Sequence, residues 1–469
     1  MSRIGILLIL LLTGCATPVP RALPPTLVPD SLAGTVRSGS PVWPDPYWWR
    51  GFGDAQLTSL VEQAQVQNRD LAIAAARVTQ AEAQSSIQRS ALFPEFSGGP
   101  DYQAGGCRGL SCRQYAAGKT FGLQFSASYE LDFFGLARDN VRAASEQLKA
   151  ARFAQQSVAL TVTTSVARQY LTVLSLRRRV AIANEYIDAI NSILEVIRLR
   201  VKAGAASHLD LAREQAQLEA VQAQLPSLET LERQALYALA VLLGRPPEGF
   251  DISLAELDAV LAPAVGVGVP SDLLLRRPDI AQAEANLASA HANVDAARAA
   301  FLPQVSLTGA GGTLSGAIGT LLQASTFGYT YGAALLQTIF DGGKRIGEKR
   351  VAEATEKEYI AAYQSAALSA YSDVESSLVE VANTGRAESH LRSLITAAQE
   401  AFEISELQYR QGAADLLTVL QAQQTLFSAE DQLAQTVLAN RLASIHLYEA
   451  LGGGWVEKPE ERTQLAQLP

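Results

Sequence analysis

The chain has 469 residues, of which 18% are charged, and its formal net charge is −9. This length ordinarily corresponds to two or three domains, and the composition is ordinary for a globular protein. The acidic balance argues against a nucleic-acid partner, because nucleic-acid binding normally requires a basic face.

The N-terminus, residues 1–14, has the pattern of a bacterial signal peptide. Arg3 supplies a positive charge, and the apolar run from Ile4 to Leu12 is shorter than the about 20 residues that span a bilayer. The run ends in Leu12-Thr13-Gly14-Cys15, which resembles the lipobox of bacterial lipoproteins, where the cysteine is acylated and becomes the mature N-terminus. Ala16 stands where an aspartate would indicate inner-membrane retention, so the resemblance favours the outer membrane. An ordinary signal peptide that happens to contain a cysteine is the alternative.

Residues 15–47 are rich in proline, which resists both helix and sheet interiors. The segment is therefore predicted to be an extended tether that follows the lipid anchor. Its prolines lie at positions 18, 20, 24, 25, 29, 41, 44 and 46. Trp48 and Trp49 follow the tether, and beyond Asp54 the sequence becomes helical.

Cys107 and Cys112 form a close pair. In an oxidising envelope such a pair favours a disulfide, and two free thiols are the alternative. A metal site would need further ligands, and the histidines lie far away in the sequence, so no metal is predicted. They are His208, His291, His390 and His446.

An internal repeat organises the rest of the chain. Four motifs recur 208 or 209 residues later, so a single-residue adjustment aligns the two halves. The pairs are Asn68-Arg69-Asp70-Leu71 with Arg277-Pro278-Asp279-Ile280, Ala91-Leu92-Phe93-Pro94 with Ala300-Phe301-Leu302-Pro303, Lys202-Ala203-Gly204-Ala205-Ala206 with Arg410-Gln411-Gly412-Ala413-Ala414, and Leu243-Gly244 with Leu451-Gly452. Each half is predicted to contain a helix, two strands, a long helix and a further helix. The predicted divisions are a first repeat at 48–244, a linker at 245–270, a second repeat at 271–452 and a tail at 453–469.

The predicted strands follow Pro94 and Pro303, where proline can end a helix. Apolar and polar residues alternate from Thr120 to Phe133 and, more loosely, from Thr326 to Ile339. The apolar positions are Phe121, Leu123, Phe125, Ala127, Tyr129, Leu131 and Phe133, and then Phe327, Tyr329, Tyr331, Ala333, Leu335 and Ile339. A half-buried soluble sheet would alternate in the same way. However, no stretch after Leu12 is apolar enough for a transmembrane helix, so membrane insertion would need strands.

Four strands cannot close a barrel, and open strand edges are not tolerated in hydrocarbon. Strands that enter a membrane must therefore be pooled by several chains. Three copies would supply twelve strands, which can enclose a water-filled lumen if the interior stays polar.

No proline occurs from Gly135 to Ala203 or from Gly343 to Gln411. Each stretch predicts a helix of roughly 68 residues, or about 100 Å. Each ends at a glycine, Gly204 or Gly412, and glycine is a common helix stop. A return helix of about 40 residues is then expected. Spacings of three and four in the later long helix predict a coiled-coil seam at Tyr363, Ala367, Ala370, Val374, Leu378 and Val381.

From Trp48 to Trp455 the sequence resembles the TolC-like outer membrane factor family, in its OprM-type (NodT-type) lipoprotein branch. The resembling motifs are Trp49-Arg50-Gly51-Phe52-Gly53-Asp54, Leu242-Leu243-Gly244-Arg245-Pro246-Pro247, Pro270-Ser271-Asp272 with Arg276-Arg277-Pro278-Asp279-Ile280, Tyr409-Arg410-Gln411-Gly412, and Leu451-Gly452-Gly453-Gly454-Trp455. The resemblance implies a homotrimer with a twelve-stranded outer-membrane β-barrel, four strands per chain, joined to a periplasmic barrel of long helices. It also implies two partners, a periplasmic adaptor and an inner-membrane pump, with this chain as a passive conduit for drugs or other small molecules.

The resemblance also suggests roles for single residues. The turns around Gly204 and Gly412 are similar to the periplasmic tips that meet the adaptor, although helix termination alone would explain them. The adaptor-contact candidates are Ala203, Gly204, Ala205, Ala206, Gln411, Gly412 and Ala413. The pore-gate candidates are Asp210 and Tyr409, which match positions that hold inner helix pairs closed, Leu417, which matches an apolar constriction, and Gln421. Gln421 departs from the acidic residue of close relatives; nearby Asp415 is an alternative acid.

No enzyme motif or cofactor fingerprint occurs in the sequence. The glycines at 309, 311 and 312 are interpreted as following a strand without opening a helix, and Asp341-Gly342-Gly343-Lys344 as a strand-to-helix turn. An export duct is therefore the leading prediction. A structural or adhesive coiled-coil lipoprotein is the alternative, and an envelope hydrolase is a third class with no visible catalytic residues.

Overall fold

The computed structural model describes residues 44–105, 118–261 and 277–455. The signal peptide and three cysteines, Cys15, Cys107 and Cys112, lie outside the described residues, as do most of the predicted tether and tail. The chain divides into two compact units. Among the described residues, one unit contains 77–105, 118–152 and 282–364 and is called the strand unit. The other contains 44–76, 153–261, 277–281 and 365–455 and is called the helical unit.

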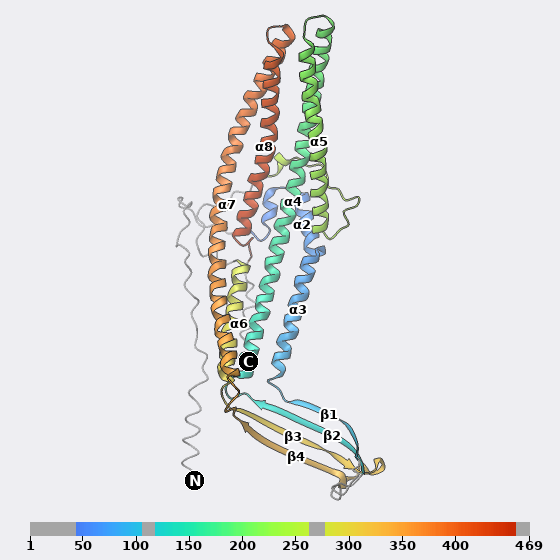
Figure 1. Ribbon diagram of the computed structural model, residues 1–469, viewed down its shortest axis with the longest axis vertical. Coiled ribbons are helices and arrows are strands. Elements are labelled where there is room, and N and C mark those ends of the chain that lie inside the picture. The colour runs from blue at the N-terminus through green and yellow to red at the C-terminus, as the bar shows by residue number, and fades with distance from the viewer. Residues whose placement is uncertain (1–43, 106–117, 262–276, 456–469) are drawn as a thin grey trace. The chain divides into compact units, whose positions relative to one another are not determined.

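From α3 and α6 onward, the two halves of the chain have the same order of elements (Figure 1), and α2 of the first half has no counterpart among the described residues of the second. A short 3-10 helix, η1 (Trp48–Phe52), precedes both. The first half contains α2 (Ala55–Gln67), α3 (Arg69–Ser90), β1 (Glu95–Gly105), β2 (Gly118–Leu131), α4 (Leu136–Lys202) and α5 (His208–Leu242). The second contains α6 (Pro278–Ala299), β3 (Gln304–Ser315), β4 (Phe327–Leu336), α7 (Lys344–Gln411) and α8 (Leu416–Ala450). Short 3-10 turns lie at Leu257–Ala259, Ile318–Thr320 and Ala324–Thr326.

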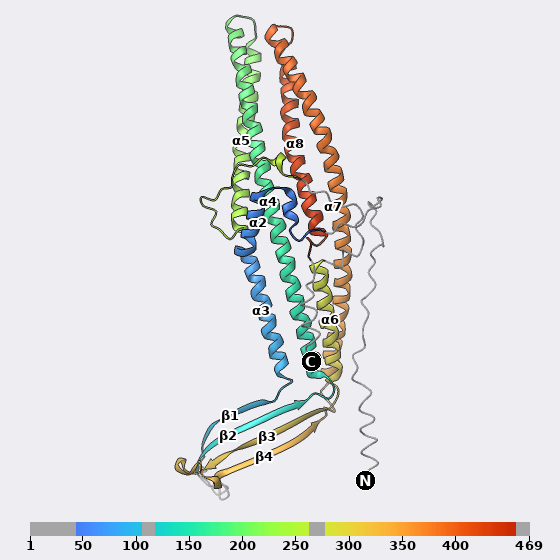
Figure 2. The ribbon, with the colours of Figure 1, turned by 180° about the vertical axis from the view of Figure 1, so that it is seen from behind.

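The long helices confirm the prediction from proline-free stretches. Helix α4 has 67 residues and α7 has 68. Within the helical unit, α4 and α5 run side by side as one hairpin, and α7 and α8 as another (Figures 1 and 2). Glycines with positive φ end both long helices, because a left-handed residue stops the helix and only glycine adopts it without a steric penalty. The values are 72° at Gly204 and 78° at Gly412.

The four strands form one antiparallel sheet in the order β1-β2-β3-β4. Directly paired residues share a face of the sheet. Phe125 pairs with Gly98 on one side and Gly311 on the other, and Gly311 pairs with Tyr329. The face they share also carries Phe96, Tyr102, Phe121, Leu123, Tyr129, Leu131, Val305, Leu307, Phe327, Tyr331 and Leu335. The predicted alternation is therefore confirmed within β2 and β4, and most apolar positions of the four strands lie on this face, whereas Leu314 and Leu336 lie on the opposite one. Two predicted apolar positions, Phe133 and Ile339, lie beyond the ends of β2 and β4.

The opposite face of the sheet is polar over most of β1 and β2. The Ser97 and Ser126 hydroxyls on paired strands lie 2.7 Å apart. By contrast, rings on the apolar face remain open to the surroundings of a single chain. Tyr331 is 85% exposed, and it stacks beside Tyr329 with ring centroids 6.5 Å apart. An apolar, aromatic face of this kind requires cover that a single chain does not provide.

Glycines inside β3 correct one sequence interpretation. Gly309, Gly311 and Gly312 lie within the strand and do not follow it. At Gly312 packing requires a glycine, since a Cβ there would lie 2.2 Å from the Leu123 carbonyl oxygen of the neighbouring strand. By contrast, the glycine pair before α7 forms the predicted turn, with φ of 66° at Gly342 and 91° at Gly343.

The main core of the helical unit gathers residues from η1, α2, α4, α5 and α8. Trp48 stacks on Tyr448 with ring centroids 5.3 Å apart. Asp54 caps α2 by accepting hydrogen bonds from the backbone N–H groups of Gln56 and Leu57, at 2.7 and 2.9 Å. Its second carboxylate oxygen accepts a 2.7 Å hydrogen bond from the Tyr170 hydroxyl, which fixes the start of α2 against α4.

Equivalent helix ends are capped by different residues in the two halves. In the first half, the Asn68 side chain donates to the Leu242 carbonyl at 2.7 Å. In the second half, the Arg277 guanidinium donates to the Ala450 carbonyl at 3.1 Å and pairs with Asp279. An unpaired carbonyl at a helix end needs a hydrogen-bond donor. The first half supplies an amide and the second half a guanidinium.

None of the helices in the described ranges is both long enough and apolar enough to cross a membrane.

Gly312→Ala should destabilise the sheet. The added methyl has no space beside the Leu123 carbonyl, so the strands must shift, at a cost of about 1–3 kcal/mol. Thermal denaturation followed by circular dichroism should show a lower midpoint and a lower yield of folded protein. Gly309→Ala is the matched control, because a Cβ there meets nothing within 4 Å. Equal midpoints for the two variants would contradict the strand packing described here.

Candidate functional site

The predicted adaptor-contact residues lie in the two hairpin turns of the helical unit. Ala203, Gly204, Ala205, Gln411, Gly412 and Ala413 are exposed, and Ala206 is half-buried. The turns close in the same way. Ala205 N–H donates to the Arg200 carbonyl at 2.8 Å, and Ala413 N–H donates to the Gln408 carbonyl at 2.8 Å. This hydrogen bond across a left-handed glycine is typical of a helix C-cap and leaves small side chains at the surface.

The helices that leave these turns begin with strong N-caps. The Ser207 hydroxyl accepts from the Asp210 N–H at 3.1 Å, and the Asp210 carboxylate accepts from the Ser207 N–H at 3.2 Å. This reciprocal capping box satisfies two otherwise unpaired donors. Asp415 caps α8 in turn, accepting from the Thr418 N–H at 2.9 Å and its hydroxyl at 2.6 Å. The Thr418 hydroxyl holds the pKa of the Asp415 carboxyl below its usual value, and the backbone hydrogen bond adds to that effect.

Arg200 links the two hairpins near their turns. Its guanidinium lies 4.5 Å from the centroid of the Tyr409 ring, a cation–π contact. It also donates to the backbone carbonyls of Tyr409 and Arg410, at 2.6 and 3.0 Å. These are carbonyls of the last turn of α7, where a cation complements the helix dipole. The sequence reasoning missed Arg200, although a basic residue in a last helical turn was a usable signal.

Tyr409, a predicted gate residue, is buried, with 5% of its surface exposed. It packs in an apolar cluster with Ile197, Leu416 and Val419, so it joins α4, α7 and α8. Burial raises the pKa of its hydroxyl, and the neighbouring Arg200 charge opposes part of that rise. The other member of the predicted pair, Asp210, instead uses its carboxylate in the capping box of α5.

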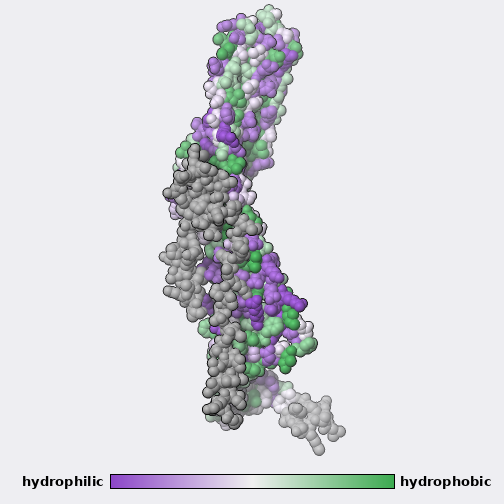
Figure 3. All heavy atoms as spheres, turned by 90° about the vertical axis from the view of Figure 1, so that its left-hand side faces the viewer, coloured by the Kyte–Doolittle hydropathy of each residue, from purple (hydrophilic) through white to green (hydrophobic). Residues whose placement is uncertain are grey.

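Leu417 and Gln421 lie four residues apart and are both exposed on one face of α8. Leu417 is 46% exposed. The neighbouring positions Leu416 and Val419 are buried, so α8 presents one face to its own chain and a different face outwards. Polar and apolar side chains are interspersed near the hairpin ends in the view of Figure 3.

Two buried polar side chains lie on the inner faces of the return helices, and sequence reasoning missed both. Glu214 of α5 is 0% exposed, and Gln423 of α8 is 2% exposed. Neither the carboxylate of Glu214 nor the amide of Gln423 has a hydrogen-bond partner among the described residues. Burial raises the pKa of Glu214 from its ordinary value of 4.5 to about 7. The available signal was the position of Glu214 between Leu211 and Leu218, on an apolar stripe.

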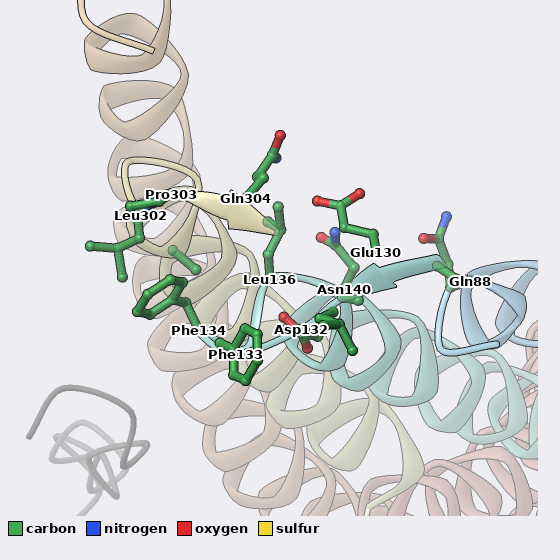
Figure 4. Close-up of a pocket in the computed structure, with 14 residues that line it drawn as sticks. Gln88, Glu130, Asp132, Phe133, Phe134, Leu136, Asn140, Leu302, Pro303 and Gln304 are labelled. Carbon is green, nitrogen blue, oxygen red and sulfur yellow. The ribbon is translucent and has the colours of Figure 1, made fainter. Parts of the chain in front are cut away.

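A small cavity of about 150 Å³ lies in the strand unit, where strands meet helices (Figure 4). It is lined by Gln88, Glu130, Asp132, Phe133, Phe134, Leu136, Asn140, Leu302, Pro303 and Gln304, among others. Asp132 is already engaged, because it accepts from the Arg138 backbone N–H at 2.9 Å and from its side chain at 3.2 Å. Ligand pockets usually measure about 300–1,000 Å³, so this cavity is small for a cargo site. In the part of the chain that the structure describes, no three His, Cys, Asp or Glu side chains gather as a metal site.

Comparisons with known proteins give a consistent assignment. A family model described as "Outer membrane efflux protein" matches residues 60–245 and 269–453. The chain is 38% identical over 418 residues to the pyoverdine export outer membrane protein OpmQ of Pseudomonas aeruginosa, covering 87% of each chain. It is 36% identical over 454 residues to OpmQ of Pseudomonas putida, covering 95% of each.

A solved structure agrees with these relatives. The open-state MtrE outer membrane channel of Neisseria gonorrhoeae superposes with a TM-score of 0.85 at 27% identity, covering 94% of this chain and 99% of that one. The predicted fold class is thereby confirmed: four antiparallel strands per chain joined to long helices, as in outer-membrane channels. The matches favour a channel over the structural lipoprotein and the hydrolase that the sequence left open.

Arg200→Gln should loosen the end of α7. The change removes a charged donor from the Tyr409 and Arg410 carbonyls. Because the site is partly open to solvent, the loss is roughly 1 kcal/mol. The backbone of the last turn of α7 should then exchange its amide protons roughly fivefold faster. Hydrogen–deuterium exchange of residues 405–411 measures this change in exchange rate. Arg198→Gln is the matched control, because Arg198 is an exposed arginine of the same helix. Unchanged exchange in Arg200→Gln would show that the contact does not stabilise this helix end.

Proposed function

Because this chain belongs to the outer membrane efflux protein family and is therefore an outer-membrane channel and not an enzyme, we propose that three copies of it form one passive export duct. The observation that carries the proposal is the four-stranded sheet with its apolar face. Its outer strands, β1 and β4, each have one unpaired edge. Backbone groups on such edges are costly in hydrocarbon, and pairing β4 of one copy with β1 of the next would satisfy them. Three copies give twelve strands around a polar interior.

We further propose how the duct is anchored and joined to its partners. Residues 1–14 are removed, Cys15 carries the lipid, and residues 15–47 tether it to the repeats. Cys107 and Cys112 form a disulfide. The hairpin turns around Gly204 and Gly412 dock on a periplasmic adaptor, which connects the duct to an inner-membrane pump. The exposed small residues of these turns support this, because they allow close backbone approach by a partner.

The gate proposed for the periplasmic end involves two kinds of contact. Asp210 and Tyr409 hold the inner helix pairs together, and Leu417 and Gln421 line the pore. The exposed positions of Leu417 and Gln421 on one face of α8 support the second assignment. Since Gln421 is neutral, three copies would form a ring of amides with less attraction for cations than a carboxylate ring has.

The proposed cargo is a small exported molecule that the pump selects. Two relatives with 36–38% identity are named for the export of pyoverdine. A cargo of that kind fits a conduit that contributes no energy and no chemistry of its own. Among the described residues, no side-chain cluster of the metal-binding type suggests a resident cofactor.

Native mass spectrometry of the detergent-extracted outer-membrane fraction should give three mature chains, each with an acyl modification. The same material should conduct ions in a planar bilayer. A deletion of residues 120–133 should abolish conductance but leave the protein membrane-attached through Cys15. A monomer, under conditions that preserve a control porin trimer, would contradict the pooled barrel.

Leu417→Ser should raise the resting conductance of the trimer several-fold, because a hydroxyl makes an apolar constriction wettable. Single-channel recordings in a planar bilayer measure this. Leu231→Ser is the matched control, since Leu231 is 45% exposed on α5, close to the 46% of Leu417. Identical conductance in both variants, with the trimer intact, would remove Leu417 from the gate.

A further inference from the structure

Glu214 interrupts an otherwise apolar stripe of α5. The stripe includes Leu211, Leu218 and Val221, which pack on α4 residues such as Ile190. Glu214 lies three residues after Leu211 and four before Leu218, so it shares their helix face. It is 0% exposed, and both carboxylate oxygens are buried without a hydrogen-bond partner among the described residues. A carboxyl group therefore lies inside a helix–helix contact where the neighbouring positions are hydrocarbon.

The groups that face Glu214 do not include a cation paired with it. On α4, the Tyr186 phenol is influenced by the Glu214 charge and accepts from the Gln217 side chain at 3.0 Å. On α7, the Glu214 charge also acts on the Tyr409 phenol. The charge of Arg200 is directed at the Tyr409 ring and at backbone carbonyls.

The remaining neighbours are neutral or engaged. The Asp210 carboxylate, one turn earlier on α5, accepts the Ser207 N–H in the capping box. On α8, Phe427 stacks on Tyr186 at 4.3 Å, and Gln423 lies four residues before it on the same buried face. Gln423 is uncharged, so α8 brings no counter-ion to this region of the contact.

The physical consequence is a preference for the protonated carboxyl. An ionised carboxylate without a partner is strongly unfavourable away from water, whereas the neutral acid is tolerated. Burial accordingly raises the pKa of Glu214 to about 7, near the pH at which envelope proteins work. When the same side chain reaches water, its pKa returns towards its ordinary value of 4.5.

We propose that Glu214 is a proton-operated latch that holds α5 against α4 beside the hairpin turn. With its proton bound, the side chain stays in the contact and the helices remain packed as described here. When the proton passes to solvent water, the carboxylate is driven towards water and α5 separates from α4 over its first turns. The latch lies one turn after Asp210 of the α5 capping box, so its release loosens the turn around Gly204.

The direction of the pH effect follows from linkage. The packed arrangement binds the proton more tightly than the separated one, so it loses stability as pH rises. The loss begins above the ordinary value of 4.5 and is complete above about 7. The pKa difference of about 2.5 allows up to roughly a three-hundredfold change in the packing equilibrium per chain, of which roughly a hundredfold falls between pH 5 and pH 8.

Hydrogen–deuterium exchange on the detergent-solubilised full-length protein tests the latch without requiring conduction. After correction for the intrinsic rate, exchange of residues 208–221 should accelerate between pH 5 and pH 8, by up to roughly a hundredfold. Glu214→Gln should remove this pH dependence, because the amide keeps the shape and cannot ionise. Glu219→Gln is the matched control, since Glu219 is exposed on the same helix.

Equal pH dependence in the wild-type protein and Glu214→Gln would overturn the latch. So would a flat wild-type profile. If Glu214→Gln is not recovered folded, Glu214→Met, which has a similar volume and no charge, replaces it with the same expected result.

Conductance in planar bilayers across the same pH range is a second measurement, and this arm rests on the proposed export duct. Wild-type open probability should rise with pH, and that of Glu214→Gln should not. A pH-independent wild-type open probability in conducting trimers would overturn the coupling of the latch to the pore. Absence of conductance at every pH would count against the proposed function, while the exchange result would still decide the latch.

Discussion

The need to pair backbone hydrogen-bonding groups at the edges of a four-stranded sheet constrains the whole molecule. Strands β1 and β4 are each bonded on one side only, and the aromatic face between them is open. In water such edges invite aggregation, and in hydrocarbon they are not tolerated. A chain that places these strands in a membrane therefore needs partner strands at both edges, and the proposed trimer would supply them from other copies of the same chain.

The helices show a related incompleteness. Helix α8 buries Leu416 and Val419 against its own chain while Leu417 remains 46% exposed. A helix packed on two faces is what a closed ring of hairpins needs, because each hairpin has neighbours on both sides. The contacts within one chain are specific and polar at the ends, where Arg200 holds the last carbonyls of α7.

How far the sequence predicts the structure depends on how local each feature is. Alternation from residue 120 predicts β2, and proline-free stretches that end at Gly204 and Gly412 predict the long helices. Both signals depend only on residues that are close together in the sequence. The glycines of β3 were misassigned, because the constraint on one of them, Gly312, comes from the Leu123 carbonyl of another strand. The contact of Arg200 with Tyr409 joins residues 209 positions apart, so the local signal, a basic residue in the last turn of α4, could not identify its partner.

The two halves share an order of elements from α3 and α6 onward, but equivalent positions at helix ends and on helix faces carry different side chains. Asn68 and Arg277 cap equivalent helix ends with an amide and a guanidinium. Glu214 lies 208 residues before Ala422, at the repeat distance of the hairpin turns, so the equivalent position of α8 carries a methyl group in place of a carboxyl. An apolar residue would fill the site without the desolvation cost of a carboxyl. A duplicated scaffold that keeps this buried acid in one copy alone places the proposed latch on one hairpin of each chain, so its release acts on the packing of α5 against α4.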